Sequence, residues 1–137
     1  MNRMVIIIIV AVLAVAIIGG GVFFFIISNQ EPKEVEIVYF EHEMAEMYTN
    51  IDHPTKILKF QMVVEYTQEG FDAEIIKQNS KIMNNVIEIF RRKSEEDTTK
   101  ASFQERVREE IREMLIEILG VDGEIITNVY FKDFIFQ

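Results

Sequence analysis

The sequence predicts an α+β protein in which an N-terminal single-pass transmembrane helix precedes one small outer domain. Three observations predict this arrangement: an uncharged apolar run near the N-terminus, two amphipathic helical patterns between strand patterns, and a closing run of aromatic and branched residues. This order of elements is typical of a domain whose two main helices pack on one face of an antiparallel sheet.

The apolar run from Met4 to Ile27 contains no charged side chain over its 24 residues. As a helix it is roughly 36 Å long, so it spans a hydrocarbon core of about 30 Å with some tilt. A cleaved signal peptide has an apolar region of only about 7–15 residues and then small residues, whereas this run is longer and ends in FFFIISNQ. We therefore expect a retained membrane anchor. The residues expected to form it include Met4, Ile9, Leu13, Ile17, Val22, Phe24 and Ile27.

The charges on either side of the run indicate its orientation. Arg3 and the free amine precede it, and Glu31 follows it. The positive-inside rule then places the N-terminus in the cytoplasm and the rest of the chain outside, at the cell (inner) membrane. The part after the run has 13 basic and 23 acidic residues, a net charge of −10. This balance excludes a nucleic-acid partner, which requires a basic face.

Small residues lie within the apolar run. Ala16 and Gly20 form a small-xxx-small pair, the spacing at which two membrane helices approach each other closely. Glycine is also common in membrane helices that use it for no contact. Both interpretations stay open, and Ala16 and Gly20 are the residues of the candidate helix contact.

The pattern divides the chain into an anchor at 1–27, a linker at 28–33 and an outer domain at 34–137. The linker SNQEPK reaches about 20 Å when fully extended. The outer domain should therefore lie close to the membrane surface.

Strand patterns open the outer domain. VEIVYF at 35–40 predicts a short strand, and the segment 41–54 is ambiguous. Apolar and polar side chains alternate at 56–67, which is typical of a strand with one buried face. One face carries Phe60, Met62, Val64 and Tyr66, and the other carries Lys59, Gln61 and Glu65.

A first helical pattern covers residues 72–93, with Asp72 as its expected N-cap. Basic residues stand at its end, where the helix dipole is negative. Ser94 and Asp97 are spaced to cap a short turn after it.

A second helix is expected to run as far as Leu119. Ser102 and Glu105 match the S-x-x-E capping box at its start. Gly120 is placed to end it, and Asp122 with Gly123 then predicts a turn before the closing strand.

The closing strand, from about Ile125 to Gln137, is apolar on both faces if its side chains alternate strictly. One face then holds Val129, Phe131 and Ile135, and the other holds Tyr130, Phe134 and Phe136. The helices of the same chain cover only one face, and several exposed large apolar side chains mark an interaction site. The candidate oligomer or partner interface is Tyr130, Phe131, Phe134 and Phe136.

Motifs for catalysis are missing from the sequence. It has no cysteine, which excludes thiol nucleophiles and zinc–thiolate sites. Its two histidines, His42 and His53, form no H-E-x-x-H motif. Glu41, His42, Glu43 and Glu46 could gather around a metal ion, but a solvated acidic stretch is the simpler interpretation. We expect no enzyme activity, no catalytic or metal-binding residues and no cofactor.

Four segments resemble a known family, the flagellar basal body-associated protein FliL. ILKFQMVVEYT resembles its first long strand, RRKSEED its turn between helices, QERVREEIREMLIEILG its second helix, and VYFKDFIFQ its closing strand. The resemblance covers the anchor and most residues after Thr55. The chain departs from the family in its short linker and in a weak match at 34–52.

The resemblance implies a non-catalytic accessory protein of the bacterial flagellar motor. Members have an outer domain similar to the stomatin and prohibitin (SPFH) class and form homo-oligomeric rings. Such rings lie around or beside the stator units of the basal body and support rotation, torque, swimming motility and chemotaxis. The alternatives are a generic membrane-anchored envelope scaffold and, less favoured, an envelope metal-binding enzyme.

Overall fold

The computed structural model describes residues 3–28, 35–53 and 55–137. The chain separates into two compact units, Met1–Glu36 and Ile37–Gln137. Most of the expected linker at 28–33, and residue 34 where the outer domain was expected to begin, lie outside the described residues. These boundaries therefore stay predictions.

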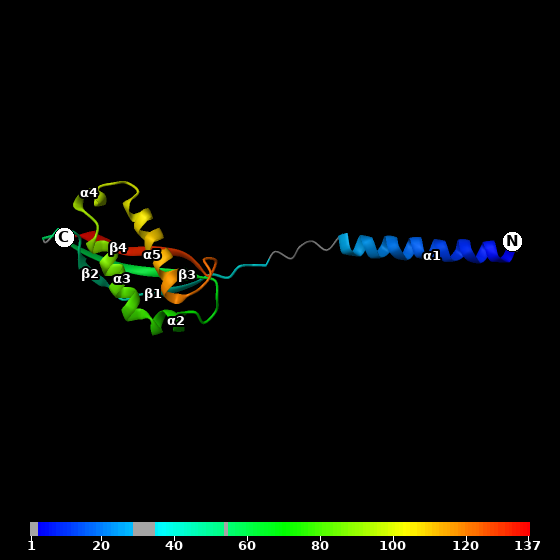
Figure 1. The fold of residues 1–137 in the computed structure, drawn as a ribbon, viewed down its shortest axis with the longest axis horizontal. Coiled ribbons are helices and arrows are strands. Elements are labelled where there is room, and N and C mark those ends of the chain that lie inside the picture. The colour runs from blue at the N-terminus through cyan, green and yellow to red at the C-terminus, as the bar shows by residue number, and fades with distance from the viewer. Residues whose placement is uncertain (1–2, 29–34, 54) are drawn as a thin grey trace. The chain divides into compact units, whose positions relative to one another are not determined.

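The first unit contains one helix, α1 (Arg3–Ser28), drawn in blue in Figure 1. Every described side chain on it is exposed in the isolated chain. By length and composition, α1 is the one helix among the described residues that could cross a membrane. A helix that is apolar on all sides is typical of a membrane span, so α1 fits the single-pass anchor that the sequence predicts.

An antiparallel sheet forms the second unit around β3 (Ile57–Tyr66), its central strand. β4 (Ile126–Phe136) pairs with one edge of β3 over most of its length. β1 (Phe40–Glu43) and β2 (Met47–Asn50) pair with the two ends of β3. Because β4 occupies one edge, these two short strands share the other. The closing strand therefore finds its partner within its own chain.

The first strand lies later in the chain than the sequence predicted. We expected a strand at 35–40, but residues 35–39 form no regular structure and β1 begins at Phe40. Phe40 stands opposite Tyr66, the last residue of β3. The residues before Phe40 therefore have no strand to pair with, whatever their β propensity.

Four helices connect β3 to β4. They are α2 (Asp72–Lys77), α3 (Asn79–Arg91), α4 (Glu95–Thr98) and α5 (Phe103–Leu119). The single helix expected at 72–93 is wrong, because Gln78 leaves the helical conformation (φ −98°, ψ 6°) and divides it into α2 and α3. Asp72 does not cap it either. The N-cap residue is Phe71, which is buried in the core and makes no side-chain cap.

The ends of α4 and α5 test three expected caps. At α4 the Asp97 N–H donates to the Ser94 hydroxyl at 3.1 Å and the Ser94 N–H donates to the Asp97 carboxylate at 3.2 Å, which confirms that cap. Gly120 ends α5 with a left-handed φ of 64°, also as expected. The box at Ser102 is wrong. Ser102 lies in a turn (φ −87°, ψ 8°) that runs directly into α5, so its side chain makes no cap.

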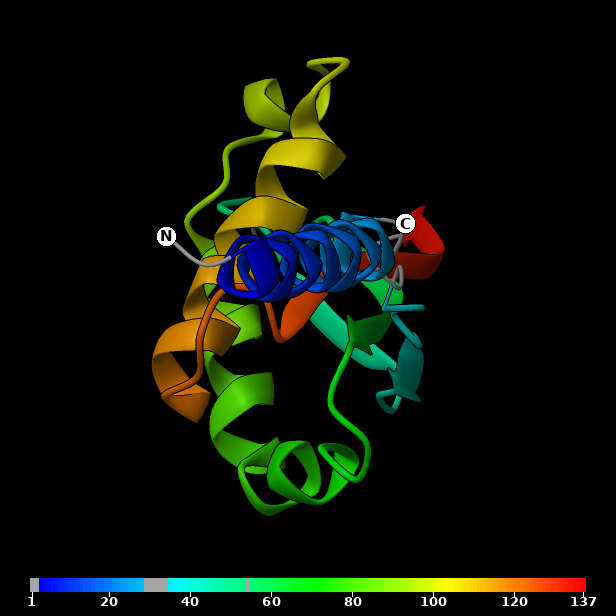
Figure 2. The same ribbon diagram turned by 90° about the vertical axis from the view of Figure 1, so that its right-hand side faces the viewer.

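The helices cover one face of the sheet, as the sequence predicts. Figure 1 shows α3 and α5 across the strands, and in the perpendicular view of Figure 2 they lie to one side of the sheet. We call the covered side the helix face. On β3 its buried side chains are Leu58, Phe60, Met62, Val64 and Tyr66. The helices contribute Ile75, Ile82, Val86, Phe90, Val107, Ile111 and Leu115. The alternation predicted for β3 is thus confirmed.

β4 does not alternate strictly, because its pairing with β3 shifts twice. Lys132 stands opposite Gln61, but Ile135 stands opposite Lys59, so β4 has one extra residue there. Asp133 lies in this bulge with a φ of 51°, a left-handed conformation that aspartate tolerates better than most residues. A second extra residue lies between Asn128 and Ile126.

The positive φ of Asp133 predicts that two substitutions there affect the free energy of unfolding differently. Asp133→Gly should change the free energy of unfolding by less than about 0.5 kcal/mol, because glycine adopts positive φ readily. Asp133→Val should destabilise the second unit by about 1–2 kcal/mol, the approximate cost of a left-handed β-branched residue. Urea unfolding of the full chain in detergent micelles, followed by circular dichroism, measures both.

The neighbouring Lys132→Val is the control, since valine is favoured at an ordinary strand position. Equal losses in Asp133→Val and Lys132→Val would contradict the left-handed bulge.

Candidate interaction surfaces

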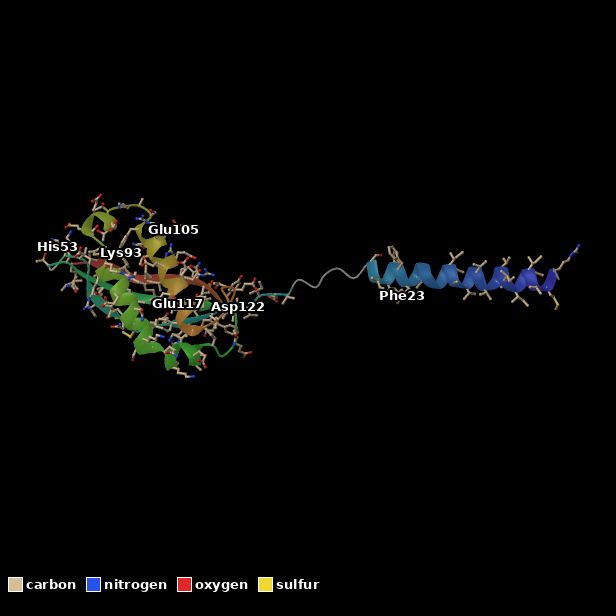
Figure 3. The ribbon with its side chains drawn as sticks, viewed as in Figure 1. Phe23, His53, Lys93, Glu105, Glu117 and Asp122 are labelled. Atoms are coloured by element: carbon tan, nitrogen blue, oxygen red, sulfur yellow. The ribbon has the colours of Figure 1, made fainter. Side chains whose placement is uncertain are left out.

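The anchor presents an apolar surface on all sides. The seven residues expected to form it lie in α1 with exposed side chains, and Figure 3 shows Phe23 projecting from the helix in the same way. An isolated helix cannot bury this surface, so a lipid bilayer or other helices must cover it.

The candidate helix contact lies on α1 with open space beside it. A Cβ atom added at Gly20 would meet no other atom within 4 Å. Ala16 is exposed one turn earlier on the same side. The described residues thus leave this site accessible to a second helix, and close packing there stays a prediction.

The three phenylalanines of β4 gather on the helix face. Because of the bulge, Phe131 and Phe134 lie on the same side, with ring centroids 5.0 Å apart. Both rings also contact Phe90 of α3, at 5.9 and 6.0 Å. Phe136 completes the group at 5.5 Å from Phe134 and is 37% exposed. The expectation that Phe134 and Phe136 share a face with Tyr130 is therefore wrong.

Tyr130 lies on the opposite side of the sheet, which we call the open face. It stands opposite Val63 of β3, and its hydroxyl donates to the Glu65 carboxylate at 3.3 Å. Thr127 donates to the same carboxylate at 2.6 Å. Of the four interface residues proposed from the sequence, Tyr130 is on the open face, Phe136 is partly exposed, and Phe131 and Phe134 pack against the core. Their part in assembly stays a prediction.

The open face carries a row of large exposed side chains that the sequence did not single out. Tyr48 stands opposite Lys59, which in turn stands opposite Ile135, so the row crosses three strands. Tyr48 is 59%, Ile57 49% and Ile135 47% exposed. No described helix covers them. The alternation of β3 gave a signal for Ile57, but Tyr48 lay in a segment of ambiguous type.

Ion pairs across the strands fix the charges of this face. Lys132 donates to Glu43, and this hydrogen bond raises the pKa of the Lys132 ammonium. Lys59 lies 3.1 Å from Glu46, and the hydrogen bond between them raises the pKa of Lys59 and lowers that of Glu46. Lys132, Lys59 and Glu46 are therefore charged at neutral pH. Glu43 and Lys132 lie on the edge strands β1 and β4, where charge discourages unwanted pairing with other sheets.

The possible metal cluster around His42 is divided by the sheet. Side chains alternate along β1, so His42 shares the side of Val64 whereas Glu41 and Glu43 share the side of Val63 and Glu65. Within the described residues, no three histidine or acidic side chains are placed to hold a metal ion. The geometry of β1 thus gives no support to the metal-enzyme alternative.

Comparison with known proteins gives a family match within the second unit. The family model described as flagellar basal body-associated protein FliL matches residues 41–137, which is more than half of the chain. No curated protein matches the sequence. The matched range begins at the second residue of β1 and includes all later strands and helices of the described residues.

The two faces of β4 should respond differently to a buried or exposed charge. Phe131→Asp should lower the free energy of unfolding by about 3 kcal/mol or more, because it places a charge among aromatic rings. Ile135→Asp should cost only about 1 kcal/mol, the effect of poor β propensity. Thermal unfolding of the full chain in micelles compares them. Similar losses would mean that the open face is covered within one chain.

Proposed function

The chain belongs to the FliL family of flagellar basal body-associated proteins, and we propose that it supports motor rotation from a position beside the stator units. The family match over residues 41–137 carries this proposal. FliL proteins are flagellar accessory proteins, and within the described residues no three histidine or acidic side chains are placed to hold a metal ion. We expect the chain to act through contacts in the basal body, without a cofactor.

The proposed topology places residues 1–27 in the cell membrane with the N-terminus in the cytoplasm. A short linker at 28–33 then leads to an extracytoplasmic domain at 34–137. Arg3 before the span and the strongly acidic composition after it support this orientation. The domain would thus reach the stator from outside the cytoplasm.

The proposed assembly is a homo-oligomeric ring around or beside the stator units. Ala16 with Gly20 on α1 supports close packing of the anchors, and the exposed row of Tyr48, Ile57 and Ile135 on the open face offers a surface to the stator. Such a ring would brace the stator and thereby affect torque, swimming and chemotaxis. It would also fit the SPFH class, to which we propose that the outer domain is similar.

The topology can be tested with reporters fused after Gln137. A reporter that is active only in the cytoplasm should stay inactive, because the positive-inside rule places the C-terminus outside. A reporter that is active only outside should be active on the same chain. The reverse result would overturn the orientation.

Deletion of the gene should abolish or strongly reduce swimming while filaments still assemble, because an accessory of rotation is not part of the filament. Soft-agar spreading and filament staining measure the two properties, and expression of the intact chain should restore spreading. A strain that swims normally would favour the generic envelope scaffold. A strain without filaments would indicate a role in flagellar construction instead.

A further inference from the structure

Basic residues are concentrated at one end of the second unit. Residues 91–108, around α4 and the start of α5, carry six basic and four acidic side chains, a net charge of +2. The rest of the second unit, 37–90 and 109–137, carries six basic and sixteen acidic side chains, a net charge of −10. This segment is therefore much less acidic than the rest of the domain. Most of its basic side chains lie in ion pairs: Arg91 with Glu88, Arg92 and Lys93 with Glu110, and Lys100 with Asp97.

A hollow of about 530 Å³ lies in the basic part. That volume is within the range of about 300–1,000 Å³ that is usual for ligand pockets. Phe103, Phe134 and Phe136 give it apolar walls, and Lys100 and Arg108 line it with positive charge. Glu105, labelled in Figure 3 at the start of α5, also lines it. The hollow thus has a mainly polar lining with one aromatic patch, which suits an apolar side chain that lies next to a carboxylate.

Arg108 has a buried hydrogen-bond donor without an acceptor. Its Nε atom is buried and has no hydrogen-bond partner among the described residues. A buried donor without a partner is costly and requires an explanation. Lys100 differs, because its ammonium already donates to Asp97 at 2.8 Å. Arg108 as a whole is only half-buried and lines the hollow, so it is the cation there to which an incoming carboxylate would bind.

α2 presents the complementary chemistry. Ile76 is 59% exposed there and offers one large apolar side chain to a partner. Asp72 stands four residues earlier, so its carboxylate lies on the same side of the helix one turn away. No ion pair joins Asp72 to another described residue; the nearby Glu74 pairs with Lys77 instead.

These two surfaces lie on opposite sides of the domain. Figure 1 shows α2 below the sheet and α4 above it, and Figure 2 shows the same separation from the perpendicular direction. One chain therefore cannot bring its own α2 to its own hollow. Two copies can, and the pair then still has one hollow free on one copy and one α2 free on the other.

We propose that α2 of one copy docks into the hollow of the next copy, with Ile76 between the phenylalanine rings and Asp72 paired with Arg108. This inference rests on the proposed ring assembly and names the surfaces that meet in it. Contacts of this head-to-tail kind close into rings or continue as helical filaments. In a closed ring all copies lie at the same height above the membrane. Copies whose anchors lie in one membrane require this.

Cysteine crosslinking can test the contact because the chain has no cysteine of its own. Ala73→Cys lies beside Ile76, and Ala101→Cys lines the hollow; both positions are exposed. Full-length chains carrying one change each are mixed in micelles and treated with a short bifunctional maleimide. The mixture should give a crosslinked dimer, and neither variant alone should do so.

A third variant, Tyr48→Cys, tests the open face as the rival contact. It should not crosslink to Ala73→Cys. If this pair crosslinks and the Ala73–Ala101 pair does not, the docking of α2 into the hollow is wrong.

Charge exchange tests the ion pair itself. Arg108→Glu should reduce the crosslink yield about tenfold or more, since like charges would then meet. Asp72→Arg should do the same, and the two changes together should restore the yield, which a variant that merely unfolds cannot do. Glu105→Gln should raise the yield by removing a competing carboxylate from the hollow. Arg106→Glu, on the same helix but outside this hollow, is the matched control and should leave the yield unchanged.

The outcomes separate this contact from the motor role. If deletion of the chain abolishes swimming but Arg108→Glu leaves crosslinking unchanged, the motor role stands and this contact is wrong. If charge exchange restores crosslinking while deletion leaves swimming intact, the contact stands and the motor role is wrong.

Discussion

The bulge at Asp133 determines which side chains of β4 face the helices, and much of the second unit depends on it. The extra residue stands opposite Phe60, whose ring packs against Phe90 at 4.6 Å and against Phe131 at 5.8 Å. Without the extra residue, alternation would turn Phe134 to the open face and remove its contact with Phe90. A single left-handed residue thus brings the phenylalanines of β4 to one side of the sheet. Bulges often reorient side chains near functional positions in this way.

This arrangement divides stability and recognition between the two faces of the sheet. The helix face is occupied by side chains of the same chain, so its residues contribute mainly to folding. The open face has Tyr48, Ile57 and Ile135 exposed between paired lysines and glutamates. Mixed apolar and charged surfaces are typical of contacts that form between already folded proteins. A charge at a β4 position should therefore affect either folding or assembly, according to the face on which it lies.

The elements that show a pattern in their own residues were predicted correctly from the sequence. The predictions were wrong where an element's structure depends on its pairing with another strand. Alternation in β3 and the helical spacing of α5 were sufficient, because each element buries one face along its whole length. The strand before Phe40 failed because β3 has no residue left to pair with it. Ser102 matched a capping motif, but the turn after α4 already sets its backbone. The alternation of β4 failed because a bulge depends on the register with its partner strand, which no periodicity of one segment reveals.

The surfaces proposed to bind a second copy could not be predicted from the sequence, because they too depend on contacts between distant segments. Arg108 and Ile76 each look ordinary in a helical pattern, and only the fold shows that one lacks an acceptor and the other lacks cover. Copies with an acidic surface repel one another, but at physiological salt this repulsion fades beyond about 8 Å. Anchoring confines the copies to one plane and raises their effective concentration, so each contact can be weak. One apolar side chain and one ion pair are then a sufficient contact, provided that the opposite charges lie on opposite sides of the domain.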